Sequence, residues 1–123
     1  YAKLLGERIA QHDTTVWLVN TGWTGGVYGV GSRIPIAYTR AMIHAALSGA
    51  LNDAQYVEDP VFHVDVPTRC PGVPKELLTP RTTWARPEDY DLQAAKLALM
   101  FSDNFKSFEK FVEPAVAAAG PQV

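Results

Sequence analysis

Ser32 and Arg33 end a glycine-rich segment whose residue types could hold an anion or a flat aromatic ligand. Residues 20–34 contain five glycines, and they follow an apolar run and precede a helical pattern. In α/β proteins ligands bind beyond the carboxyl end of a strand, where a following helix can direct N–H groups at an anion. The spacing matches neither the dinucleotide-binding glycine motif nor the P-loop. Gly29 and Gly31 are two apart, but Ile34 stands where the dinucleotide-binding motif has its third glycine. Ligand contact through Ser32 and Arg33 and a plain flexible loop are therefore both open.

His63, Asp65 and Cys70 are the candidate metal ligands. Strand alternation would put His63 and Asp65 on one side, where alternate residues project together. A third and fourth ligand are not evident, and one imidazole, one carboxylate and one thiol share many surfaces by accident. We therefore expect no metal ligand here. His12 is expected at a helix end, where imidazole suits the negative end of the dipole, and His44 is expected in solvent.

The residue types needed for nucleophilic catalysis do not occur in a recognisable pattern. Cys70 lacks a sequence feature that would activate its thiol, and no G-x-S-x-G elbow is present. Phe101, Phe105 and Phe108 lie at helical spacing, which favours a core stripe over a base-stacking platform. We expect no catalytic residue in the chain.

Helices and strands must alternate to position these residues. The spacing of apolar residues predicts helices over residues 1–12, from Pro35 to about Gly49 and from Pro87 to about Phe111. The second and third helices should bury the stripes Ile36, Thr39, Ile43, Ala46, Leu47, Ala50 and Leu97, Phe101, Phe105, Phe108, Val112. Strands are predicted over residues 14–20 and 61–66. Residues 52–60 should be a polar connector, and the proline-rich residues 67–87 an ordered irregular segment with one helical turn over residues 75–78.

The strand predicted over residues 14–20 is apolar without alternation, which is typical of a strand covered on both faces. A chain of 123 residues can hardly build a wide sheet and also cover it. We therefore expect a central strand of a larger sheet. Because the sequence also begins with Tyr1 rather than Met, we expect it to be a piece of a longer chain.

Composition limits the classes of protein. With 123 residues, 47% of them hydrophobic and 20% charged, the chain fits one globular domain at most and is too apolar for disorder. A formal net charge of −2 offers no general field for nucleic acid. The longest uncharged stretch is interrupted by glycines, so we expect no membrane span. A single cysteine and the lack of a secretory leader make the cytoplasm the expected compartment.

Short motifs follow one another in a fixed order from the glycine-rich segment to the last residues. The first two motifs extend from Val16 to Gly26 and from Tyr28 to Ile34, and Tyr38-Thr39-Arg40 follows them. The later ones are Phe62, Val66-Pro67-Thr68, Pro71-Gly72-Val73-Pro74, Leu77-Leu78-Thr79-Pro80, Phe101-Ser102-Asp103-Asn104-Phe105 and Ala118-Ala119-Gly120-Pro121. This ordered series resembles the C-terminal part of the ATP-dependent phosphoenolpyruvate carboxykinase family, and it spans essentially the whole chain.

The resemblance implies an α/β fold, with residues 1–123 as the C-terminal segment of the mixed α/β nucleotide-binding domain and no second domain. It implies an enzyme of gluconeogenesis or fermentation that converts oxaloacetate and ATP to phosphoenolpyruvate, CO2 and ADP with Mg2+ and Mn2+. The expected partners are the rest of the same enzyme, ATP and oxaloacetate, with neither nucleic acid nor a membrane. The family's P-loop, metal ligands and oxaloacetate-binding arginine lie upstream of the matched part, so we expect the chain to be inactive alone.

The resemblance carries three residues over to the nucleotide. In the family an Arg-Ile pair after the glycine-rich loop and a Thr five residues further on contact ATP, and they match Arg33, Ile34 and Thr39. A guanidinium can stack on adenine, an isoleucine can offer apolar contact and backbone groups, and a hydroxyl can form a hydrogen bond. The chain would thus supply an adenosine-side wall of the ATP pocket. The alternatives are a non-catalytic domain that binds a nucleotide or a partner through residues 22–34, and a purely structural piece.

Overall fold

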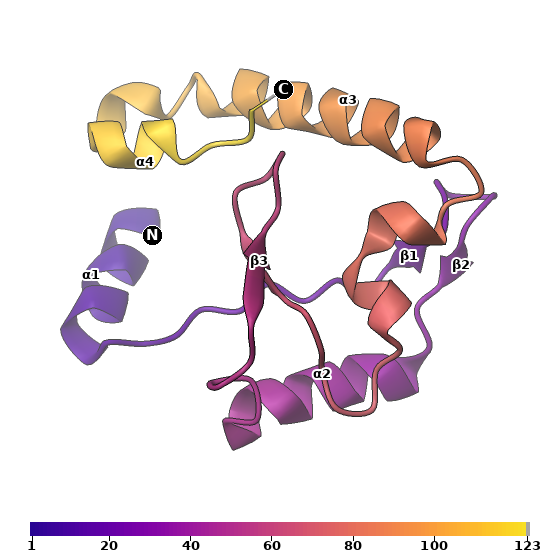
Figure 1. Cartoon of the computed structure of the whole chain (residues 1–123). Helices are drawn as coiled ribbons and strands as arrows, with labels where there is room; N and C mark the ends of the chain where they lie inside the picture. Colours follow the sequence, from indigo (N-terminus) through magenta and orange to yellow (C-terminus); the bar gives the residue numbers. More distant parts are fainter. Residues whose placement is uncertain (123) are drawn as a thin grey trace.

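The computed structural model describes residues 1–122 and combines helices with two small antiparallel hairpins, which confirms the α/β class. In chain order the elements are α1 (Ala2–His12), β1 (Trp23–Thr24), β2 (Ser32–Arg33), α2 (Ile36–Ser48), β3 (Tyr56–Glu58), β4 (Asp65–Pro67), the 3-10 turns η1 (Lys75–Leu78) and η2 (Pro80–Thr83), α3 (Pro87–Phe105), the 3-10 turn η3 (Glu109–Phe111) and α4 (Pro114–Ala118). Helices α3 and α2 run along opposite sides of the molecule, and the β3–β4 hairpin stands between them (Figure 1). None of the helices in residues 1–122 is long and apolar enough to span a bilayer.

Proline and glycine mark both ends of α2 and the start of α3, as the sequence predicts. Helix α2 follows Pro35 and ends at Gly49, whose φ of 80° is a left-handed conformation that glycine adopts without strain. Helix α3 begins at Pro87 and carries Glu88 and Asp89 in its first turn, near the positive end of the helix dipole. The helix predicted over residues 1–12 and the turn predicted over residues 75–78 are also confirmed.

The strand predicted over residues 14–20 is wrong for this chain, because these residues carry no regular secondary structure. Trp17 is half-buried and packs on the core, whereas Val16 and Leu18 are 61% and 84% exposed. A strand forms only where a neighbouring backbone accepts and donates its hydrogen bonds, and neither hairpin of residues 1–122 pairs with this segment.

The second hairpin differs from the prediction at both of its strands. Strand β3 lies within the predicted connector over residues 52–60, and β4 begins only at Asp65, so much of the strand predicted over residues 61–66 is a turn. The Asp59 carboxylate makes this turn by accepting the N–H groups of Val61 and Phe62 at 2.9 and 2.8 Å. Asx turns compete with strand pairing in this way, and apolar alternation does not reveal them.

The buried core is small and consists largely of small side chains. Ala45 of α2, Leu51 and Cys70 form its centre, and the half-buried residues packed around them are Trp17, Met42, Ala46, Ala54, Val73 and Leu78. The other buried apolar residues are Ile34 and the alanines Ala94 and Ala98 of α3.

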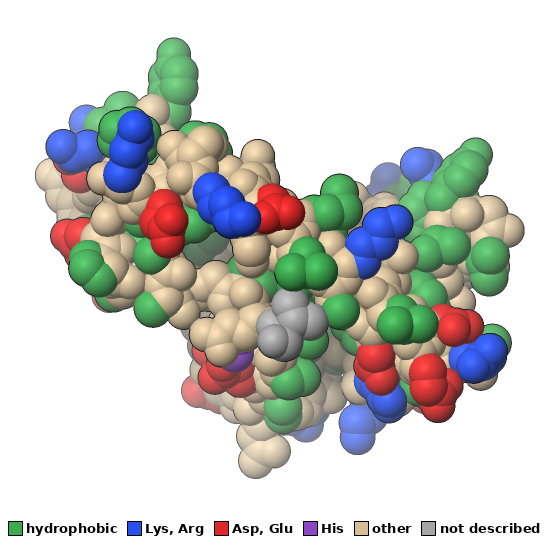
Figure 2. Space-filling view, turned by 90° about the horizontal axis from the view of Figure 1, so that it is seen from above, with side chains coloured by type: hydrophobic (Ala, Val, Ile, Leu, Met, Phe, Trp, Pro, Cys, Tyr) green, Lys and Arg blue, Asp and Glu red, His purple; other side chains and the backbone are tan. Residues whose placement is uncertain are grey.

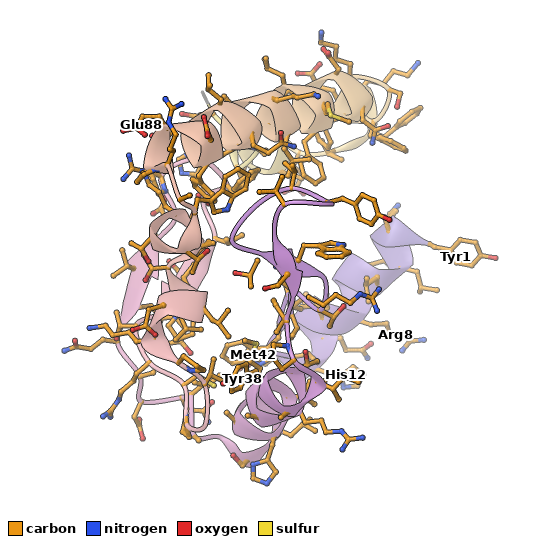
Figure 3. All side chains as sticks on the ribbon, turned by 90° about the vertical axis from the view of Figure 1, so that its right-hand side faces the viewer. Tyr1, Arg8, His12, Tyr38, Met42 and Glu88 are labelled. Atoms are coloured by element: carbon orange, nitrogen blue, oxygen red, sulfur yellow. The ribbon has the colours of Figure 1, made fainter. Side chains whose placement is uncertain are left out.

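The apolar stripe predicted for α2 packs within the chain only in part, through the half-buried Thr39 and Ala46. Ile36, Ile43 and Leu47 are exposed, and Ala45 is buried instead. Tyr38 and Met42 point from α2 toward the middle of the molecule (Figure 3). Helical periodicity identifies an apolar surface, but only the surrounding chain decides which part of that surface is covered.

The stripe predicted for α3 also meets solvent. Phe101 and Phe108 are about half exposed, while Ala94 and Ala98 are buried. The helix ends at Phe105 rather than near Phe111, and the chain continues through η3 and α4. The last described residue, Gln122, donates its N–H to the carbonyl of Val61, which ties the C-terminal segment to the β3–β4 turn.

Candidate functional site at the first hairpin

The glycine-rich residues 20–34 form a hairpin rather than a plain loop. Trp23 lies opposite Arg33 and Thr24 opposite Ser32 in the antiparallel pair β1–β2. At its tip, the N–H groups of Val30 and Gly31 both donate to the carbonyl of Val27. Ser32 and Arg33 therefore lie on a strand that leads directly into α2, where their positions are restrained by pairing.

Gly31 is required by the close approach of the two chain segments. A Cβ atom at this position would lie 2.5 Å from the carbonyl oxygens of both Thr24 and Gly26. Real Cβ atoms do not come this close to backbone oxygen, so the glycine allows the hairpin to close where it does. The close approach comes from within the hairpin and does not indicate a ligand.

Hydrogen bonds anchor the junction between the hairpin and α2. Ile34 donates its N–H to the carbonyl of Gly22 at 2.9 Å, and its side chain is only 7% exposed. The Asn20 side chain accepts the N–H of Gly22 and donates to the carbonyl of Trp23. Ile34 thus acts mainly as an anchor, and burial leaves little of its side chain for contact with a ligand.

Arg33 presents a cation beside an aromatic ring. Its guanidinium carbon lies 5.9 Å from the centre of the Trp23 ring, and the side chain is exposed. Tyr28, from the tip of the hairpin, packs edge-on against Trp23 with ring centres 5.2 Å apart. Within residues 1–122 Arg33 forms no ion pair, so its charge is available to an anionic or aromatic ligand.

Thr39 lies in the first turn of α2, half-buried, with its N–H directed at the carbonyl of Pro35 at 3.4 Å. The structure therefore places Arg33, Ile34 and Thr39 around one short junction between β2 and α2. A cation, a buried anchor and a hydroxyl thus follow one another within seven residues of the chain, residue types that can contact a nucleoside.

The candidate metal ligands do not come together. His63 directs Nδ1 at Oε1 of Glu58 at 2.7 Å, whereas Cys70 lies in the core. Burial raises the pKa of the Cys70 thiol, which favours the unreactive protonated form. Across residues 1–122 no three His, Cys, Asp or Glu side chains gather where they could hold a metal ion. His12 is the last residue of α1 and His44 is exposed, as predicted.

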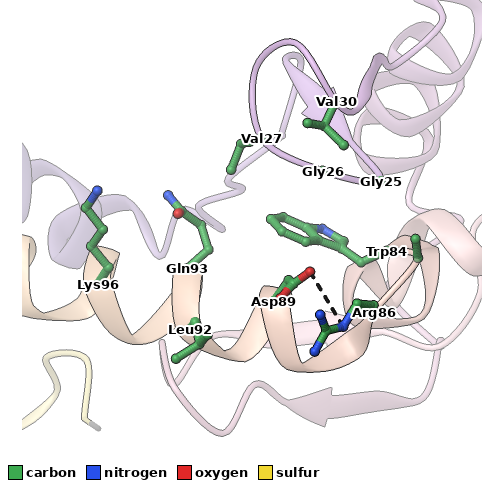
Figure 4. A pocket seen from close by; sticks show the side chains of 11 residues that line it. Gly25, Gly26, Val27, Val30, Trp84, Arg86, Asp89, Leu92, Gln93 and Lys96 are labelled. Carbon is green, nitrogen blue, oxygen red and sulfur yellow. Dashed lines mark ion pairs between the residues drawn. The ribbon is translucent and has the colours of Figure 1, made fainter.

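A pocket on the other side of the hairpin tip was not predicted. It has a volume of about 390 Å3. Trp84 lies in the pocket between the hairpin tip and α3 (Figure 4). The tip contributes Gly25, Gly26, Val27 and Val30, and α3 contributes Asp89, Leu92, Gln93 and Lys96. The hydroxyls of Thr24 and Thr83 approach to 3.4 Å beside it. Its two walls lie more than fifty residues apart in sequence, so the sequence does not reveal the pocket. The one available signal is Trp84, a large aromatic residue in a proline-rich segment.

Comparisons with known proteins agree on one family. The family model described as phosphoenolpyruvate carboxykinase matches residues 1–76. The chain is 57% identical over 122 residues to phosphoenolpyruvate carboxykinase (ATP) of Thermus thermophilus and 55% identical over 123 residues to phosphoenolpyruvate carboxykinase (ATP) 2 of Moorella thermoacetica. These alignments cover 99% and 100% of this chain but 23% of each relative. The chain thus spans about a quarter of the length of the curated relatives it matches.

Proposed function

The chain belongs to the phosphoenolpyruvate carboxykinase family, and on this premise we propose that it is part of an ATP-dependent member of that family. The longer protein, called the full-length enzyme below, would convert oxaloacetate and ATP to phosphoenolpyruvate, CO2 and ADP in the cytoplasm. The proposal rests on the 57% identity, over nearly the whole chain, to a relative named phosphoenolpyruvate carboxykinase (ATP). Residues 1–123 would be the C-terminal segment of its nucleotide-binding domain.

We further propose that this segment forms an adenosine-side wall of the ATP pocket. Arg33 would stack its guanidinium on the adenine ring, and the hydroxyl of Thr39 would form a hydrogen bond with the nucleoside. Ile34 would hold both residues in place, because its buried side chain and its hydrogen bond to Gly22 anchor the junction between them. The exposed guanidinium of Arg33 supports this role.

ATP with Mg2+ and Mn2+ would supply the phosphoryl group and the charge compensation that the reaction needs. The described residues do not fit such a metal site, since no three His, Cys, Asp or Glu side chains gather among them. We therefore assign the metal ligands to the rest of the full-length enzyme. The residues of this chain would bind and orient the nucleoside only.

The substitution Arg33→Ala in the full-length enzyme tests the site. Loss of the stacked cation should raise the KM for ATP on the order of tenfold, the ratio that corresponds to about 1.4 kcal/mol. The KM for oxaloacetate and the affinity for Mn2+ should stay the same, because Arg33 would touch neither. Steady-state kinetics and metal titration provide these measurements.

Arg8→Ala is the matched control, since it removes an equal charge from an exposed site on α1. It should leave the KM for ATP unchanged. An unchanged KM for ATP in Arg33→Ala would show that the assignment of Arg33 to the base pocket is wrong.

A further inference from the structure

The hairpin places one particular aromatic ring against the guanidinium of Arg33. Trp23 and Arg33 are direct register partners, and directly opposed residues of an antiparallel pair project on the same face. The guanidinium carbon is 5.9 Å from the centre of the Trp23 ring. This lies at the edge of the range of about 6 Å in which a cation is attracted by an aromatic face.

The guanidinium has a second face that the described residues leave open. Arg33 is exposed and forms neither an ion pair nor a side-chain hydrogen bond within residues 1–122. A guanidinium is planar and stacks on flat rings from either side. With the indole on one side, the other side can take a further flat group.

Trp23 is itself held in position. Tyr28 packs against its ring nearly perpendicularly, at 87°. The carbonyl of Trp23 accepts a hydrogen bond from the Asn20 side chain at 3.3 Å. The backbone of Trp23 is therefore anchored, its ring contacts Tyr28 of the hairpin tip, and we take the ring as a platform for Arg33.

We propose that Trp23 is a positioning residue for nucleotide binding. Its indole holds the Arg33 guanidinium flat, so that the opposite face of the guanidinium stacks on the base in the order indole, guanidinium, adenine. Trp23 acts through Arg33 and does not touch the nucleotide. This inference rests on the proposed role of Arg33 in binding ATP.

Kinetics of Trp23→Ala and Trp23→Leu in the full-length enzyme test the proposal. Both remove the aromatic face, and both should raise the KM for ATP about two- to fivefold with little change in kcat, the range expected for an exposed cation–π contact. Trp23→Phe keeps an aromatic face and should restore most of the affinity. Trp23→Leu keeps the apolar volume, so it carries the test if the alanine variant does not fold.

A double-mutant cycle shows whether the effect passes through Arg33. In the Arg33→Ala background, Trp23→Leu should leave the KM for ATP unchanged. Thr24→Val, the neighbouring hairpin position, is the control for general disturbance of the hairpin and should not change this KM in either background. The inference would be wrong if Trp23→Leu raised the KM for ATP equally with and without Arg33. It would also be wrong if Trp23→Leu had no effect on this KM while Arg33→Ala raised it. In both cases the proposed function would stand. If Arg33→Ala had no effect, the proposed ATP site and this inference would both be overturned.

Discussion

At the scale of single residues, Gly31 determines whether the hairpin that carries Arg33 can close. Gly31→Ala would place a Cβ 2.5 Å from two backbone oxygens, and backbone cannot move aside as a flexible side chain can. We expect the free energy of unfolding of the full-length enzyme to fall by about 1–3 kcal/mol, together with an increase in the KM for ATP. Thermal or urea denaturation and ATP kinetics measure the two effects.

Gly6→Ala is a matched control with the opposite expected sign. Gly6 lies inside α1, and a Cβ there would meet no atom within 4 Å. Alanine restricts the unfolded chain and favours helix, so stability should rise by up to about 1 kcal/mol. Equal effects of the two substitutions would contradict the close approach at Gly31.

The pair of Arg81 and Asp91 connects two elements, η2 and α3, and gives stability a pH dependence. Arg81 donates from Nε and Nη2 to the two carboxylate oxygens at 2.8 and 2.9 Å. These hydrogen bonds hold the pKa of Asp91 below its ordinary value of 3.8. A lowered folded-state pKa adds stability above the unfolded-state pKa, and this stability is lost as the pH falls through the folded-state value.

Asp91→Asn should therefore be slightly less stable than the original protein at neutral pH. The difference should begin to shrink as the pH falls below about 4 and should vanish only below the lowered folded-state pKa of Asp91. Both side chains are half exposed, so the effect is small and should shrink further in high salt. Urea denaturation of both proteins across this pH range measures it. A difference that persists at pH 2 would show that Asn disturbs η2 or α3 in some other way.

At the scale of the elements, residues 14–20 have the apolar composition of a buried strand but lie largely in solvent. Val16 and Leu18 are exposed, and the segment has no strand partner among residues 1–122. We expect this segment to add to a sheet of the full-length enzyme, because a β-branched apolar run needs both backbone partners and cover. Hydrogen exchange should show protected amides at Val16 and Leu18 in the full-length enzyme and rapid exchange in the 123-residue chain. Rapid exchange in both would contradict the expectation, with the amides of α3 as an internal reference.

The molecule as a whole exposes more surface than a compact protein of its mass. Its accessible surface is 9540 Å2, whereas about 6,500 Å2 is expected for a folded monomer of this size. The excess of roughly 3,000 Å2 is several times the area that one partner buries in a standard interface. Apolar side chains lie among the charged ones over the face seen from above (Figure 2). This surface supports the proposal that the remainder of the full-length enzyme covers the chain.

The purified 123-residue chain should accordingly self-associate and should show no oxaloacetate-dependent consumption of ATP. One wall of a divided pocket should also bind ATP much more weakly than the micromolar Kd, about −8 kcal/mol, expected of a complete binding module. Sedimentation, a coupled ATP assay and titration calorimetry measure these properties. Turnover by the chain alone would refute the proposed division of labour, and micromolar binding without turnover would favour a non-catalytic nucleotide-binding domain.

The sequence by itself determined the features that depend on residues close together along the chain. Pro35, Gly49 and Pro87 act through their own backbone geometry, so the limits of α2 and the start of α3 could be predicted. The ordered motifs indicated the family, which the comparisons confirmed. The region of the candidate site was also recognisable, because five glycines before a helix stand out in any sequence.

Only the tertiary structure decided which surfaces meet. The pairing of Trp23 with Arg33, the burial of Ala94 in place of Phe101, and the turn closed by Asp59 all depend on neighbours in space. Periodicity shows that a surface is apolar, but it carries no information on what lies opposite. For the same reason residues 14–20 look like a strand in the sequence and remain unpaired in this chain, since hydrogen bonds between strands need a second strand.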